Sequence, residues 1–82
     1  MTTKIKSAIA RSISHNEIVI VKVDDIAAAL ATVDVAAAEY DHTGLDSGDS
    51  GERREDVWGT TGDGSEFRLL LVKTLAIASH AA

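Results

Sequence analysis

Residues 46–52 form the segment of this 82-residue chain that comes nearest to a metal site. The stretch Asp-Ser-Gly-Asp-Ser-Gly-Glu supplies acids, hydroxyls and a glycine at the sixth place, as a calcium-binding loop does. Its third position is Gly48 instead of Asp or Asn, and its twelfth is Val57, where that loop needs a bidentate Glu. The departures favour a solvated loop, and we expect no metal and no other cofactor.

The glycines at positions 59, 62 and 64 could suggest a loop that cradles phosphate. Asp63 lies among them, and no helix is expected to follow, so the charge and the missing helix N-terminus both disfavour a phosphate. Gly62-Asp63-Gly64-Ser65 instead predicts the tight turn of a hairpin, because glycine permits positive φ values.

Histidine and serine also occur without a catalytic arrangement. The histidines are His15, His42 and His80, and they show no metal-ligand spacing. No serine lies in a G-x-S-x-G elbow, and neighbours in sequence such as Ser14 and His15 do not form the spatial array of a triad. Paired carboxylates in so small a domain are more often surface charge than acid–base catalysts. We expect a protein that is not an enzyme.

Charge is the property that points to a partner. The chain has 13 acids and 8 Lys or Arg, a formal charge of −5, which disfavours direct contact with nucleic acid. Residues 39–66 hold nine acids against Arg53 and Arg54, whereas residues 1–22 carry a net +3. Such polarity steers a domain toward a protein with a basic surface, although an acidic stretch can equally serve solubility. The candidate partner-binding residues are Asp46, Asp49, Glu52, Glu55, Asp56, Asp63 and Glu66.

Trp58 is the single tryptophan and a possible anchor for a partner. With Val57 and Phe67 nearby in the expected sheet, it could form an exposed hot spot. The domain is small and needs core volume, so burial between helix and sheet is the favoured interpretation.

Two stretches near the N-terminus predict strands. Residues 17–23 are dominated by β-branched side chains and indicate a strand. Upstream, Ile5, Ile9 and Ile13 are spaced four apart, which fits one face of a helix or one face of a strand. The turn-forming residues 14–16 that follow favour a strand over residues 4–13, closing a hairpin.

Asp24 and Asp25 supply a helix cap, so a helix is expected to begin there. Its apolar stripe is Ile26, Leu30, Val33, Ala37 and Tyr40. Residues 41–54 lack apolar periodicity and predict an exposed acidic Gly/Ser loop. Residues 55–61 and 66–72 then predict two strands, with Phe67, Leu69 and Leu71 on one face and Arg68, Leu70 and Val72 on the other. The tail, residues 74–82, is compatible with a strand, a short helix or fraying.

These elements predict one α+β domain over residues 1–82, an antiparallel four-stranded sheet with one amphipathic helix on one face (ββαββ). The chain has no cysteine, and no stretch reaches the ~18 apolar residues of a membrane span, so a reducing cytoplasm without membrane contact is expected.

The chain resembles small phage-encoded anti-CRISPR proteins, especially inhibitors of type I systems. The likeness is one of size, acidity, lack of cysteine and architecture, with residues 23–29 (VDDIAAA) at the strand-to-helix junction and residues 56–59 (DVWG) before the hairpin. The resemblance implies an inhibitor that binds a type I surveillance complex (Cascade) in the bacterial cytoplasm and blocks target DNA, with carboxylates as phosphate mimics. It carries over no functional residue.

A self-assembling phage structural or regulatory protein is the alternative. The second face of the sheet is partly apolar and needs a cover, which a second copy can provide. A homodimer would then use Leu70, Val72, Leu75 and Ile77.

Overall fold

The computed structural model describes residues 2–47 and 51–74. Its elements in chain order are α1 (Thr2–His15), β1 (Ile18–Lys22), α2 (Ile26–Ala36), β2 (Glu39–Ser47), β3 (Glu52–Thr60) and β4 (Glu66–Thr74). The expected α+β class is confirmed, with two helices instead of one. Neither helix in this part of the chain is long and apolar enough to cross a membrane.

The strands form one mixed sheet in the order β1-β4-β3-β2. β2 pairs with β3 and β3 with β4 in antiparallel fashion, while β1 lies parallel to β4 at the edge. The wholly antiparallel ββαββ prediction is therefore wrong in topology. A parallel pair requires a long crossover, and here α2 and the β2–β3 hairpin, which lie between β1 and β4 in the chain, supply it.

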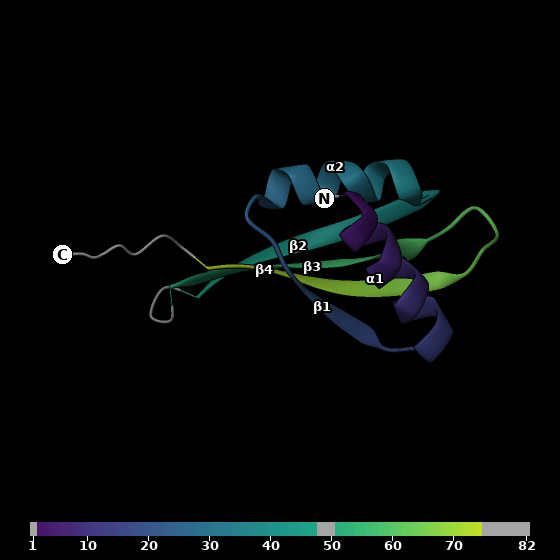
Figure 1. The fold of residues 1–82 in the computed structure, drawn as a ribbon, viewed down its shortest axis with the longest axis horizontal. Helices are drawn as coiled ribbons and strands as arrows, with labels where there is room; N and C mark the ends of the chain where they lie inside the picture. Colours follow the sequence, from purple (N-terminus) through teal and green to yellow (C-terminus); the bar gives the residue numbers. More distant parts are fainter. Residues whose placement is uncertain (1, 48–50, 75–82) are drawn as a thin grey trace.

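Both helices cover the same face of the sheet (Figure 1). α1 packs on β1 and β4, α2 packs on β4 and β2, and the two helices contact each other. The predicted alternation along β4 is confirmed, since Phe67, Leu69 and Leu71 are each at most 1% exposed beneath the helices. Val21 and Val33 complete the centre of this core.

Residues 4–13 form part of α1, so the strand predicted there is wrong. Ile5, Ala8, Ile9 and Ser12 are all buried, and their spacing of i, i+3, i+4 and i+7 is that of a helix face. The strand interpretation rested on the isoleucines and on the turn-forming residues that follow them, although Ala8 also fitted a helix face. The burial of Ala8 and Ser12 distinguishes the helix, because a strand would place these two residues on the face opposite the isoleucines.

Residues 14–16 do turn the chain into β1, but from a helix. Asn16 has a φ of 52°, the left-handed conformation common just past a helix C-terminus. The Glu17 N–H donates to the Ser12 carbonyl at 3.2 Å, the long-range bond of a Schellman motif. This ending directs β1 back along the sheet.

The helix predicted after Asp24 and Asp25 is confirmed. Asp25 is its N-cap, and its side chain accepts from the Ala28 N–H at 3.2 Å. The helix is shorter than its apolar stripe indicated, because Ala37 is extended and Ala38 N–H donates to Thr60 O at 2.8 Å. Tyr40 therefore lies in β2, partly buried against the core.

The exposed loop predicted over residues 41–54 is mostly strand. β2 and β3 form a long antiparallel hairpin in which Asp46 is paired with Arg53 and Ser47 with Glu52. Cross-strand pairing overrides the low β propensity of Gly, Asp and Ser in this stretch. The later hairpin is confirmed: β3 and β4 are joined by residues 61–65, with Gly64 at a φ of 86°.

Candidate binding surface

Within residues 2–47 and 51–74, no helix covers the face of the sheet opposite α1 and α2, and we call this face the open face. Paired residues point to the same side of a sheet, so each row across it is set by the strand register. Ile18, Arg68, Trp58 and Asp41 form one row, and Ile20, Leu70, Asp56 and Thr43 form the next. Ile18 is 51% exposed and Ile20 is 64% exposed, so the β1 and β4 half of the open face presents apolar area to solvent.

Trp58 belongs to the open face and is 42% exposed. The favoured prediction of burial between helix and sheet is therefore wrong. Val57, its neighbour in β3, takes the core position instead and is 1% exposed. Asp56 lies two positions before Trp58 and Arg54 lies four positions before it, so all three share the open face by strand alternation.

Four carboxylates surround Trp58 in the register of the sheet. Asp41 is its cross-strand partner in β2, and Asp56 lies two residues before it in β3. Glu39 and Glu66 flank Thr60, which is the next open-face residue along β3. Arg68 lies beside Trp58 on the β4 side. The indole thus lies within an acidic frame with one adjacent cation.

A shallow cleft of about 740 Å³ opens at the same end of the molecule. Its lining includes Ser12 and Tyr40 from the helix-covered side and Trp58 and Arg68 from the open face. The cleft gives a partner side chain room to approach the edge of the indole.

The predicted partner-binding acids do not form one surface. Asp56 and Glu66 lie on the open face near Trp58, and Glu52 lies toward the other end of that face, where its carboxylate accepts from Arg54 at 3.2 Å. Asp46 pairs through its backbone with Arg53 in the β2–β3 hairpin. Asp49 lies outside the described residues, as do Leu75 and Ile77 of the predicted dimer interface.

Glu55 is buried on the helix-covered face, with 4% of its surface exposed. Its carboxylate makes a hydrogen bond with His42 Nδ1. The Glu55 side chain is 6% exposed and the His42 side chain is 44% exposed. Gly44 leaves the space that the carboxylate fills, because a Cβ there would lie 2.7 Å from Glu55 Oε1. Glu55 is therefore a structural acid in this fold and is not presented to a partner.

This pair does not extend into a metal-binding cluster. Within residues 2–47 and 51–74, no group of three His, Asp or Glu side chains is arranged to hold a metal ion. His42 stacks on Tyr40, with the ring centroids 6.0 Å apart and the ring planes inclined by 24°.

Asp63 organises the β3–β4 turn. Thr61 Oγ1 donates to its Oδ1 at 2.5 Å and the Ser65 N–H donates to the same oxygen at 3.1 Å. The Thr61 and Ser65 hydrogen bonds hold the pKa of this carboxyl below its ordinary value, because they stabilise the ionised form. Asp63 thus serves the turn that sets the register of β3 and β4.

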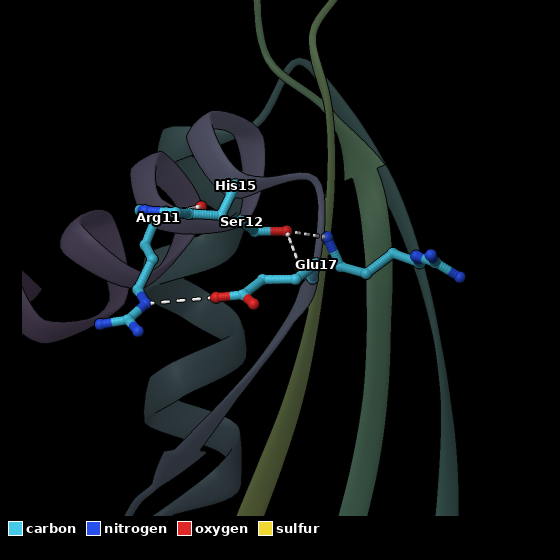
Figure 2. Close-up of polar contacts among 5 residues, drawn as sticks. Arg11, Ser12, His15 and Glu17 are labelled. Atoms are coloured by element: carbon cyan, nitrogen blue, oxygen red, sulfur yellow. Dashed lines mark hydrogen bonds and ion pairs between the residues drawn. The ribbon is translucent and has the colours of Figure 1, made fainter.

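Ser12 joins the start of β1 to β4 through two hydrogen bonds (Figure 2). The buried Ser12 hydroxyl donates to the Glu17 carbonyl at 2.7 Å and accepts from the Arg68 N–H at 2.8 Å. Arg11 Nε donates to the Glu17 carboxylate at 3.4 Å on the outside of the same junction. The hydroxyl completes the β1–β4 ladder where β1 begins.

Sequence reasoning missed Glu39, Asp41 and Arg68 as neighbours of Trp58. Glu39 and Asp41 belong to the acidic stretch, but the face of the sheet on which they lie depends on the register of the β2–β3 hairpin. Had residues 41–47 been recognised as a strand, the pairing of Asp41 with Trp58 would have been predictable from the hairpin.

No protein-family model matches this chain. Neither the curated proteins nor the solved structures contain a match to it.

Proposed function

We propose that this chain is a protein-binding module that uses the open face of its sheet to contact a basic protein surface. The observation that carries the proposal is the exposure of Trp58 on the face that neither α1 nor α2 covers, within a frame of carboxylates. Trp58 shares this face with the exposed Ile18 and Ile20, and an exposed apolar patch with polar residues around it is typical of an interaction surface.

The chemistry of the frame selects the partner. A lysine or arginine over the indole gains a cation–π contact, and Asp41 and Asp56 are placed to accept its hydrogen bonds. Such an aromatic anchor contributes about 2 kcal/mol or more at a protein interface when it becomes fully desolvated. The surrounding acids accelerate association and make it dependent on salt.

The more specific proposal is inhibition of a type I CRISPR surveillance complex. Surfaces that hold DNA are basic, so the acidic frame of Trp58 can occupy one and exclude the target DNA. Supporting this reading are the net charge of −5 and the clustering of carboxylates on the open face, which allow partial mimicry of phosphates. The buried Glu55 has no part in this contact.

The test is capture of type I complexes from a bacterial lysate that expresses them, at low and at high salt. We expect wild-type protein to retain Cas subunits at low salt and to release them at high salt. Trp58→Ala should lower capture at least about tenfold, because it removes the hot spot. The double variant Asp41→Asn/Asp56→Asn should lower it by as much, because it removes the charges beside the hot spot.

The matched control is Asp24→Asn/Asp34→Asn, which changes the net charge equally at exposed positions that lie outside the sheet. It should capture as wild type does. If both double variants lost capture equally, net charge alone would explain the loss. Unchanged capture by Trp58→Ala and by Asp41→Asn/Asp56→Asn would remove the open face as the contact. Capture of no Cas subunit by wild-type protein would refute the CRISPR assignment.

A further inference from the structure

We infer that the open face is self-complementary and that two copies of this chain stack through it about a two-fold axis. The inference rests on the proposed binding role of that face and names a second copy as one partner. Its starting point is the division of the open face into an apolar half on β1 and β4 and a charged half on β3 and β2. Ile18, Ile20 and Leu70 form the apolar half, and Trp58 and Asp56 belong to the charged half.

The charged half is acidic at one end and carries an ion pair at the other. Asp41 lies beside Trp58 toward one end, Asp56 lies at the centre of β3, and Arg54 lies toward the other end, paired with Glu52. The Arg54 guanidinium is 3.2 Å from Glu52, and the arginine side chain is 47% exposed. An ion pair this exposed is worth about 0–1 kcal/mol, so Arg54 can exchange it for a better partner.

A two-fold axis perpendicular to the strands, passing under the row of Ile20, Leu70 and Asp56, brings these ends together. Strand β3 of one copy then lies across β3 of the other in the opposite direction. Because Trp58 and Arg54 are equally spaced about Asp56, Trp58 of each copy faces Arg54 of the second copy. The contact occurs twice, as a two-fold interface requires.

The apolar half is compatible with the same axis. Ile20 and Leu70 meet their own counterparts near the axis, and Ile18 faces the aliphatic stem of Lys22 from the second copy. The two Asp56 carboxylates approach each other, each beside an Arg54 from the opposite copy. Two sheets stacked in this way cross at roughly −30° because of their twist.

The size of the face agrees with a reversible dimer. Four strands about 4.8 Å apart, most of them nine residues long at about 3.3 Å per residue, give roughly 500 Å² in plan. A standard interface buries about 800 Å² per partner. A face smaller than a standard interface favours a reversible dimer over an obligate one.

The decisive experiment is a charge exchange measured by sedimentation velocity over a dilution series. Arg54→Glu places a carboxylate against Asp56 of the second copy. Asp56→Lys places an ammonium against Arg54 of the second copy and against the lysine that replaces Asp56 there. Each variant alone should raise the dimer Kd by about a hundredfold, since the contact is lost twice. A 1:1 mixture of the two should restore the wild-type Kd to within about tenfold, because both contacts are then between opposite charges.

Recovery of the dimer in the mixture also shows that both variants are folded, because unfolded chains could not form the interface. A wild-type chain that stays monomeric at several hundred micromolar would overturn the inference. So would a dimer that Arg54→Glu and Asp56→Lys leave intact, which would place the interface elsewhere, for example along the β1 edge. The proposed function is tested separately: salt-sensitive capture of a basic partner that needs Trp58, by a chain that never self-associates, overturns only the dimer.

Discussion

Replacement of Ser12 by alanine tests how the edge strand is held in place. The side chain is 3% exposed and makes two hydrogen bonds, one to the Glu17 carbonyl at 2.7 Å and one from the Arg68 N–H at 2.8 Å. Ser12→Ala leaves the Arg68 N–H without this acceptor, and an unsatisfied buried donor costs about 1–3 kcal/mol. The Glu17 carbonyl adds a smaller loss, and the better helix propensity of alanine offsets about 0.5 kcal/mol.

The expected net destabilisation is about 2 kcal/mol, which lowers the Tm of a domain this small by roughly 10 °C. Ser14→Ala is the matched control, because Ser14 lies on the same helix and is exposed. Urea unfolding followed by circular dichroism measures the free energy, and amide exchange at Arg68 reports the local opening of β1 from β4. The reasoning is refuted if the two alanine variants unfold within about 0.5 kcal/mol of each other.

Two further predictions concern β3 and the turn that follows it. Gly59→Ala should destabilise by about 3 kcal/mol, because its Cβ would lie 2.3 Å from the Glu39 carbonyl oxygen, whereas Gly62→Ala, with nothing within 4 Å, should be near neutral in the same urea titration. Because the pKa of Asp63 is lowered in the folded state, its ionised carboxylate stabilises the fold at pH values above the ordinary carboxyl pKa. This stabilisation is lost as the pH falls through the pKa of the folded state. The gap in Tm between wild type and Asp63→Asn should therefore narrow below about pH 4, and a constant gap down to pH 2 would contradict it.

Local signals predicted the elements whose chemistry is short-range. The strand at residues 17–23 is confirmed as β1, the cap at Asp25 begins α2, and the Gly62-Asp63-Gly64-Ser65 turn joins β3 to β4. β-branched runs, capping acids and turn glycines each act within a few residues, so a single sequence is enough to identify them.

The errors arose where tertiary packing decides between two periods. Ile5, Ile9 and Ile13 fit helix and strand equally, and only the burial of Ala8 and Ser12 against β4 distinguishes the helix. Residues 41–47 have little β propensity and become a strand because β3 pairs with them.

The candidate site was predicted in part for the same reason. Asp56, Glu66 and Trp58 were named in advance and lie together on the open face, whereas Glu55 points to the buried side one residue before Asp56. Alternation in a strand makes neighbours in sequence belong to opposite faces, so an acidic stretch cannot be assigned to one surface until the register is known. The exposure of Trp58 follows from both helices lying on the other face.

Acrylamide quenching of Trp58 tests the central claim most directly, because it is the single tryptophan of the chain. The measurement compares dilute wild-type protein, the Arg54→Glu variant and a wild-type complex with a captured basic partner. The account predicts ready quenching in the dilute protein and in Arg54→Glu, and strong protection in the complex. A tryptophan that is protected in Arg54→Glu at every dilution, or equally quenched with and without the partner, would contradict the open face as the binding surface.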